Sequence, residues 1–278
     1  MSISSDHSRS VYRKLDKDLE QLSSAPTPQT IHRFRTGVRR LQTLLEEISP
    51  RRDRHQKKLL KLLARLRKRA GKVRDLDMQL GALRTLKSAQ EPRRKTQLTQ
   101  ALLELRARHE RKLRKSLTKR EIRDIQKRLK RVLGNGKLQP KHDPVAVARK
   151  ILSKLVPPAN EIRDEQLHAY RKSIKRARYA MEFADGSASS REVMAQLKHL
   201  QDALGDWHDW WTLTGNARNR LGDVHQSSLV ASMHSVTRSK FRQAVAALAV
   251  SPLLKHSLAR AADEPRKSAA AESTKQAA

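Results

Sequence analysis

The fold is decided by residues 31–48, which read IHRFRTGVRRLQTLLEEI. Apolar side chains recur there every three or four residues, which is the spacing of one face of an α-helix. On a helical wheel the apolar side holds Phe34, Val38, Leu41, Leu44, Leu45 and Ile48. The opposite side holds His32, Arg35, Thr36, Arg39 and Thr43, with Arg33 and Arg40 at the border. The stretch therefore predicts a helix that buries one face and presents a ladder of cations, led by a histidine, on the other.

The same pattern returns at an offset of 136 in the numbering, where positions 167–182 read LHAYRKSIKRARYAME. The matched pairs are His32 and His168, Arg35 and Arg171, Arg39 and Lys175, Arg40 and Arg176, and Glu46 and Glu182. Tyr170, Ile174, Ala177 and Met181 face inward on the wheel, whereas His168, Arg171, Lys172, Lys175 and Tyr179 face outward, with Arg176 at the border. A second pair of segments, Gly71–Asp75 and Gly205–Asp209, follows at an offset of 134. Two units in the same order predict a duplicated helical bundle with approximate two-fold symmetry.

The rest of the chain also shows helical periodicity, and no stretch alternates convincingly as a strand. Pro, Gly or small polar residues predict breaks at Ser23–Gln29, Pro50, Ser88–Pro92, Gly134–Pro144, Pro157–Asn160 and Asp185–Ser190. We expect an all-α protein in which residues 1–262 form one domain of two repeats, 1–136 and 140–262. Residues 263–278 lack apolar periodicity and are expected to be a disordered tail.

Charge is the other informative property. The chain has 61 Lys and Arg against 28 Asp and Glu, a formal net charge of +33. Residues 1–140 hold 39 of the cations and 14 of the acids, so the first half is much more basic than the second. A charge of this size exceeds what solubility needs and repels itself, which indicates an anionic partner.

Other residue types narrow the functional classes. The chain has no cysteine, which excludes disulfides, thiolate zinc sites and cysteine nucleophiles and fits a reducing cytoplasm. The N-terminal segment has no apolar signal core, and no run of about 18 apolar residues exists, so no membrane segment is expected. No nucleophile–base arrangement, glycine-rich phosphate loop or set of metal ligands is apparent, and we expect neither an enzyme nor a cofactor or metal.

More cations follow the first ladder. They are nearly continuous between Arg51 and Arg74, and a third basic helix is expected over Arg106–Arg131. Asp75 and Asp209 stand at equivalent positions, where we expect them to orient a ladder residue or fix a helix start rather than act as a general base. Trp210 and Trp211 are expected to pack into the core.

These residues resemble the CHAD family, the conserved histidine α-helical domain. The resemblance rests on His32-x-x-Arg35-x-x-x-Arg39-Arg40, Gly71-Lys-Val-Arg-Asp75-Leu-Asp77, His168-x-x-Arg171-x-x-x-Lys175-Arg176-Ala-Arg178-Tyr179-x-x-Glu182 and Leu200-Gln-Asp-Ala-Leu-Gly205 with Asp209. It implies two pseudo-two-fold-related four-helix bundles around a basic central cavity. It also implies binding of inorganic polyphosphate and a cytoplasmic location at polyphosphate granules.

The resemblance also assigns the binding residues. Those implied are His32, Arg35, Arg39, Arg40, Arg67, Lys68, Arg74, His168, Arg171, Lys172, Lys175, Arg176 and Arg178. The sequence departs from the family pattern at Gln42, Ala177 and His208. The second copy also has Gln201 and Asp202 where the first has Arg67 and Lys68, so binding is expected to rely more on the first half. Some relatives carry an N-terminal triphosphate-tunnel domain, whose motif is not found, and we expect no attached phosphohydrolase.

A nucleic-acid or general polyanion binder is the competing hypothesis, because the net charge supports it equally. Against it, aromatic side chains for base stacking are few and no base-reading motif is recognised. Weak nonspecific binding of nucleic acid is still expected. Whether the two histidines contact the ligand or are structural stays open.

Overall fold

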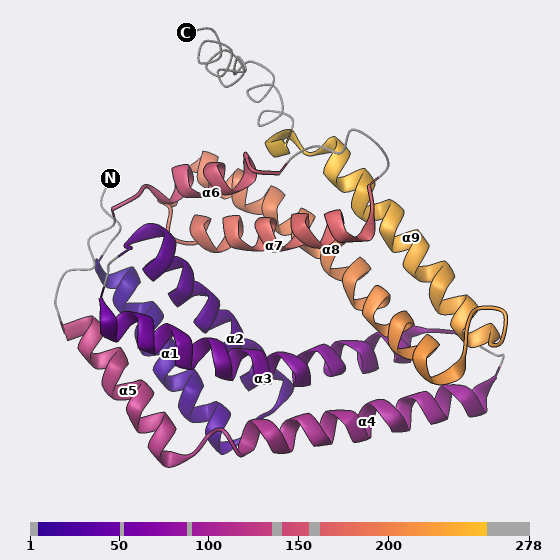
Figure 1. Ribbon diagram of the computed structural model, residues 1–278. Helices are drawn as coiled ribbons and strands as arrows, with labels where there is room; N and C mark the ends of the chain where they lie inside the picture. The colour runs from indigo at the N-terminus through magenta and orange to yellow at the C-terminus, as the bar shows by residue number, and fades with distance from the viewer. Residues whose placement is uncertain (1–4, 51–52, 88–90, 135–140, 156–161, 255–278) are drawn as a thin grey trace, which may run out of the picture.

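The computed structural model describes residues 5–50, 53–87, 91–134, 141–155 and 162–254, and every regular element in these ranges is a helix (Figure 1). The elements are α1 (Ser5–Ser24), α2 (Pro28–Thr43), the π-helix η1 (Leu44–Ile48), α3 (Arg54–Thr85), α4 (Pro92–Arg114), α5 (Lys119–Gly134), α6 (Pro144–Leu152), α7 (Asp164–Met181), α8 (Ala188–Leu221) and α9 (Ser228–Val250). The prediction of an all-α protein is confirmed. None of the described helices is long and apolar enough to cross a bilayer.

Local sequence explains where most helices begin. Thr27, Asp143, Ser187 and Ser227 each accept a hydrogen bond from a backbone N–H three residues later, which caps the helix that follows. Proline occupies the first turn of α2, α4 and α6, where its missing N–H costs no helical hydrogen bond. The predicted breaks at Ser23–Gln29, Ser88–Pro92 and Asp185–Ser190 therefore contain helix ends or helix starts.

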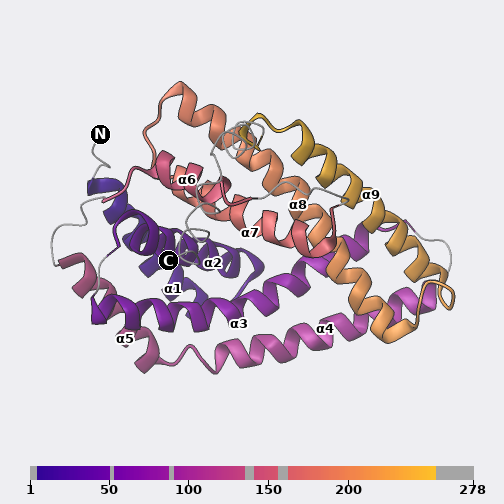
Figure 2. The same cartoon turned by 45° about the horizontal axis from the view of Figure 1, so that its top comes forward.

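The duplication predicted from sequence is matched by the helix boundaries. Helix α7 begins at an offset of 136 from α2, α8 begins at an offset of 134 from α3, and α9 both begins and ends at an offset of 136 from α4. In each copy the helices pack in chain order, with α2 on α3 and α3 on α4 in the first, and α7 on α8 and α8 on α9 in the second (Figure 2). The two copies meet where α2 packs on α7 and α3 packs on α8.

The apolar core consists of three clusters rather than of one cluster in each of two separate bundles. One apolar cluster joins α1, α2, η1, α5 and much of α3 with Leu113 of α4 and Phe183 of the second copy, and a second joins α6, α7, the first half of α8 and the second half of α9. A third cluster is shared between the copies and contains Leu80, Leu83, Leu102, Leu213 and Met233. It exists because α3 and α8 extend beyond their own bundles, and their far ends pack together with α4 and α9.

Two expectations about individual segments were wrong, and one break was not predicted. The third basic helix is interrupted at Lys115–Thr118, where the Ser116 hydroxyl donates to the Leu113 carbonyl at 2.7 Å just after the end of α4. A further break separates α8 from α9, beginning at Gly222, whose φ of 89° suits glycine. Thr43, expected on the polar face, is buried.

The tryptophans also differ from expectation. Trp207 is fully buried, Trp210 packs partly buried against the shared cluster, and Trp211 is exposed rather than in the core. The apolar side chains predicted to face inward from the two ladder helices are buried, as predicted. They are Phe34, Val38, Leu41, Leu44, Leu45 and Ile48 in the first copy and Tyr170, Ile174, Ala177 and Met181 in the second. The predicted tail and most of the joint between the repeats lie outside the described residues.

Candidate anion-binding site

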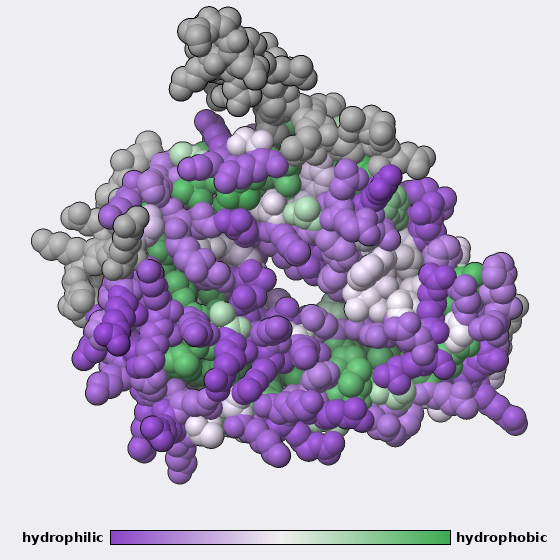
Figure 3. All heavy atoms as spheres, in the orientation of Figure 1, coloured by the Kyte–Doolittle hydropathy of each residue, from purple (hydrophilic) through white to green (hydrophobic). Residues whose placement is uncertain are grey.

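Cations from both copies gather between α2, α3, α7 and α8. We call Arg35, Arg39, Arg67, Arg171 and Lys175 the central cluster, because each lies close enough to others of the set to affect their protonation. The ribbons of these four helices surround an opening in Figure 1, and the space-filling view shows it bordered mainly by hydrophilic side chains (Figure 3). The structure therefore brings together ladder residues that are far apart in the sequence.

Burial and the neighbouring positive charges lower the pKa values of cations in this cluster. Burial, followed by the Arg171 charge, lowers the pKa of Lys175 to about 8. Burial and the neighbouring Arg39 and Arg35 lower the pKa of Arg67 to about 10. Burial likewise lowers the pKa values of Arg39 and Arg171. Cations whose charged forms are disfavoured in this way would be stabilised by an anion between them.

Hydrogen-bonding capacity in the cluster is only partly used. The buried Nε atoms of Arg67 and Arg171 have no hydrogen-bond partner within the part of the chain that the structure describes. No described carboxylate lies within 4 Å of the charged groups of Arg39, Arg67, Arg171 or Lys175. Buried donors without partners are unusual, and they are the groups that a bound ligand satisfies.

Arg35 is held in place by α3. Its Nη1 donates to the Gly71 carbonyl and to Asp75 Oδ1, both at 3.2 Å. A Cβ at position 71 would lie at ordinary van der Waals distance, 3.7 Å, from the guanidinium carbon, so this contact does not require glycine. Asp75 thus orients a ladder residue, as expected, and the alternative that it fixes a helix start is wrong because it lies within α3.

Asp209, the equivalent of Asp75, lies within α8 near Arg171 and Lys175. Burial raises the pKa of its carboxyl, while these two cations lower it. Its negative charge offsets part of the lowering of the pKa values of both cations. Each copy therefore supplies one carboxylate beside the cluster.

The two histidines at equivalent positions have different surroundings. His32 lies near Arg74 and Arg35, and burial together with these charges lowers its pKa. His168 instead contacts aromatic rings, with ring centroids 4.9 Å from Trp207, 4.9 Å from His208 and 4.6 Å from Trp211. His32 and Arg74 lie near Arg35 and Lys175 of the central cluster, whereas His168 lies near Arg171 and the exposed Lys172.

Besides Arg35, three of the expected binding residues are paired with carboxylates. Arg40 of the first copy pairs with Glu182 of the second, and Arg176 of the second pairs with Glu47 of the first. Arg178 pairs with Glu182 at 2.9 Å and donates to Gln201 at 2.7 Å. Arg40 and Arg176 tie the copies together, whereas the partners of Arg178 lie in its own copy, and less of the charge of all three is free for a ligand.

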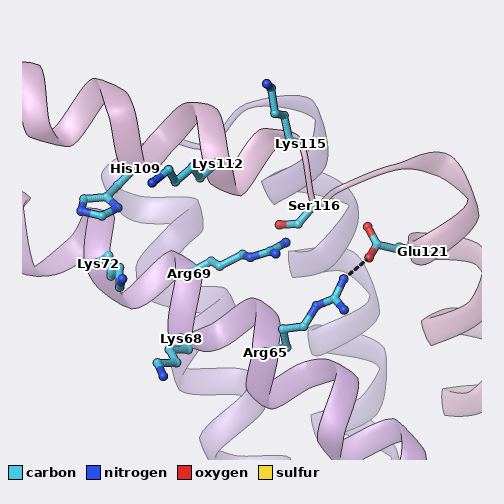
Figure 4. A pocket seen from close by; sticks show the side chains of 9 residues that line it. All are labelled: Arg65, Lys68, Arg69, Lys72, His109, Lys112, Lys115, Ser116 and Glu121. Carbon is cyan, nitrogen blue, oxygen red and sulfur yellow. Dashed lines mark hydrogen bonds and ion pairs between the residues drawn. The ribbon is translucent and has the colours of Figure 1, made fainter.

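Lys68 lies away from the cluster, in a groove on the other side of α3. This cavity of about 530 Å³, which we call the outer groove, lies between α3, α4 and the start of α5 (Figure 4). Sequence reasoning noted its cations but not the groove, because the groove depends on the unpredicted break between α4 and α5. Nowhere in the described ranges are three or more Asp, Glu, His or Cys side chains placed to share a metal ion.

Comparison with known proteins identifies the family. The chain is similar in fold to the crystal structure of the CHAD domain from the plant Ricinus communis, with a TM-score of 0.58 and 19% sequence identity over 90% of this chain and 88% of that one. No curated protein matches the chain. The family model for the CHAD domain matches residues 9–218, well over half of the sequence. The chain therefore belongs to the CHAD domain family.

Proposed function

We propose that this protein binds inorganic polyphosphate through the central cluster, and that this binding brings it to polyphosphate granules. The observation that carries the proposal is the convergence of Arg35, Arg39, Arg67, Arg171 and Lys175 from two copies, four of them without an ion pair among the described residues. Each guanidinium can donate two parallel hydrogen bonds to one phosphate, a geometry that suits arginine.

The placement of the cations favours a thin and flexible ligand. Inward-facing cations on the three helices α2, α3 and α7 can surround a single phosphate chain on several sides, whereas a rigid duplex would meet cations on one side only. The ladder residues lie about one helical turn apart, so successive phosphates could meet successive cations. Membership of the CHAD family supports the same ligand.

Binding rather than catalysis is proposed. The cluster offers charged donors, and its two nearby carboxylates, Asp75 and Asp209, hold or face arginines. No metal or other cofactor is required for such binding. The net charge of +33 also supports weak nonspecific binding of nucleic acid, which is the second candidate function.

A competition titration tests the proposal. Labelled long polyphosphate is bound near physiological salt and displaced with duplex DNA or short phosphates at equal charge. We expect long polyphosphate to win by orders of magnitude and its affinity to fall steeply with salt, through counterion release. Equal competition by DNA would instead favour a general polyanion binder.

A quadruple variant locates the site. Arg35→Ala, Arg39→Ala, Arg171→Ala and Lys175→Ala together should weaken polyphosphate binding by at least about 10³-fold, since a charged hydrogen bond contributes about 1.5–3 kcal/mol. The control removes four exposed cations of α5, Lys119, Arg123, Lys127 and Lys130, and should weaken binding far less. A folded quadruple variant with unchanged affinity would rule out the central cluster as the site.

A further inference from the structure

The outer groove is the second place where cations gather. Its lining includes Arg65, Lys68, Arg69, Lys72, Lys112 and Lys115. Their side chains come from α3 and from the end of α4, around a common hollow, and only Glu121 adds negative charge (Figure 4). A cavity of about 530 Å³ falls within the usual range of small-ligand sites, about 300–1,000 Å³.

The packing of α4 keeps this groove open. The fully buried side chains of α4 are Leu98, Leu102 and Leu113, and the stretch between the last two holds polar residues toward α3. Ion pairs fix the surrounding helices: Arg106 contacts Asp77 of α3 at 2.6 Å, and Arg65 contacts Glu121 of α5 at 2.6 Å. The groove is therefore preformed by one ion pair outside its lining, Arg106 with Asp77, and by one within the lining, Arg65 with Glu121.

Most of the charge in the groove is not compensated. No carboxylate of the described residues lies within 4 Å of the charged groups of Lys68, Arg69, Lys72 or Lys112. His109 lies among them, and burial together with the Lys72 and Lys112 charges lowers its pKa. An anion in the groove would relieve this repulsion.

The groove is separate from the central cluster. At about 100° per residue, Lys68 and Lys72 lie on a different face of α3 from Arg67 and Arg74. The second copy has no equivalent basic face: Asp202 and Asp206 replace Lys68 and Lys72 at the offset of 134. Duplication of the ladder therefore does not account for the groove.

We propose that the outer groove binds a second stretch of phosphate chain, so that one protein molecule holds two stretches of polyphosphate at once. The ligand class rests on the proposed function. Lysine and arginine are suited to phosphate, and no Phe, Tyr or Trp lines the groove for stacking on a base. Two separate sites on one molecule would link neighbouring strands and so condense the polymer.

Calorimetric titration of the full chain with tripolyphosphate tests this inference. The groove variant carries Lys68→Gln, Lys72→Gln and Lys112→Gln, and the central variant carries Arg171→Gln and Lys175→Gln. A matched control carries Lys119→Gln, Lys127→Gln and Lys130→Gln, three exposed residues of α5 outside the groove. NMR signals of the His109 ring, assigned from their loss in His109→Gln, report on the groove directly.

We expect the groove variant to bind one tripolyphosphate fewer than the wild type and the control. The His109 signals should shift on binding in the wild type and in the central variant, but not in the groove variant. Long polyphosphate mixed with the groove variant should show at least a several-fold loss of light scattering from linked strands, although each protein still binds.

Other results would overturn the inference. The number of sites in the groove variant could equal that of the wild type, or the His109 signals of the wild type could stay unchanged when tripolyphosphate is added. Either result would show that the outer groove is not a second site, and would leave the proposed function intact. Failure of the proposed function would look different, because the central variant would then keep all its sites. Displacement from the groove by polyglutamate as readily as by tripolyphosphate would refute a phosphate site.

Discussion

The two copies of the repeat agree at most positions where they face each other, Arg67 and Gln201 being an exception, and differ where they face away. In the facing region Arg35 corresponds to Arg171, Arg39 to Lys175 and Asp75 to Asp209, and all six lie in or beside the central cluster. On the outer side, Lys68 and Lys72 of α3 correspond to Asp202 and Asp206 of α8. The shared residues build one site from both copies, and the unshared residues give each copy properties of its own.

The outer faces differ in packing as well as in charge. At the positions of His109 and Lys112 on α4, helix α9 has Val245 and Leu248, which pack against the second apolar cluster. Asp202 and Asp206 are paired with Lys198 at 2.5 Å and with Lys240 at 3.0 Å. The second copy is therefore closed and internally neutralised at the place where the first has an open basic groove.

The largest effect is expected from the core that the copies share. Leu102→Ala and Met233→Ala each remove a fully buried side chain from the third cluster, one in each copy. Each should lower the free energy of unfolding by about 2–5 kcal/mol through lost contacts and a cavity. Because both copies contribute to this cluster, calorimetry should show one transition at a lower temperature. Two separate transitions would mean that the copies unfold independently.

Next in size is the contribution of each copy to binding. Arg35→Ala with Arg39→Ala, and Arg171→Ala with Lys175→Ala, remove matched pairs from the first and the second copy. Each pair should weaken polyphosphate binding by about 10²-fold, since these are charged hydrogen bonds to one ligand. A titration that finds a large loss in one pair and none in the other would show that a single copy holds the polymer.

The part of the fold that follows from helical periodicity and from the internal repeat could be predicted from the sequence. The buried face from Phe34 to Ile48 and the ladder opposite it follow from spacing, and the matched offsets indicated that the ladders form one site. Arg40 and Arg176 could not be separated from the other cations, because their partners Glu182 and Glu47 are assigned only by the packing of α2 and η1 on α7. Arg178 pairs with Glu182 four residues later, a spacing that is present in the sequence.

The rest depended on contacts between distant segments. The end of α4 at Lys115 lies in a segment whose charge pattern continues like that of a helix, next to the hydrogen bond from the Ser116 hydroxyl to the Leu113 carbonyl. The shared cluster depends on how far α3 and α8 extend beyond their own bundles. The outer groove needs both features, so the cations that line it looked like an ordinary solvated face.

A smaller effect is expected from pH, and it distinguishes Lys175 from its equivalent Arg39. The pKa of Lys175 is about 8, below its usual 10.5, so this side chain loses its charge first as pH rises. Polyphosphate binds the charged form, so affinity should fall between about pH 7 and about pH 9, by at most about tenfold for one charge. Lys175→Arg should remove this slope, because arginine stays protonated.

Stability of the unliganded protein should change with pH in the opposite direction. Between the folded pKa of Lys175, about 8, and its usual value of 10.5, the unfolded chain binds more protons than the folded one. The free energy of unfolding therefore rises with pH in this window. Thermal unfolding without ligand from about pH 7 to about pH 10 measures it. A melting temperature that falls in step with affinity would indicate global destabilisation rather than titration of Lys175.

The smallest effect is expected on the outer face of the second copy. Asp202→Lys with Asp206→Lys gives α8 the charges that α3 carries at Lys68 and Lys72. The lost ion pairs are exposed, so the free energy of unfolding should change by no more than about 1 kcal/mol. The number of tripolyphosphate molecules bound should stay that of the wild type, because Val245 and Leu248 of α9 pack where the first copy is open. One additional bound tripolyphosphate would show that charge alone makes such a site and that the shape of the outer groove is unnecessary.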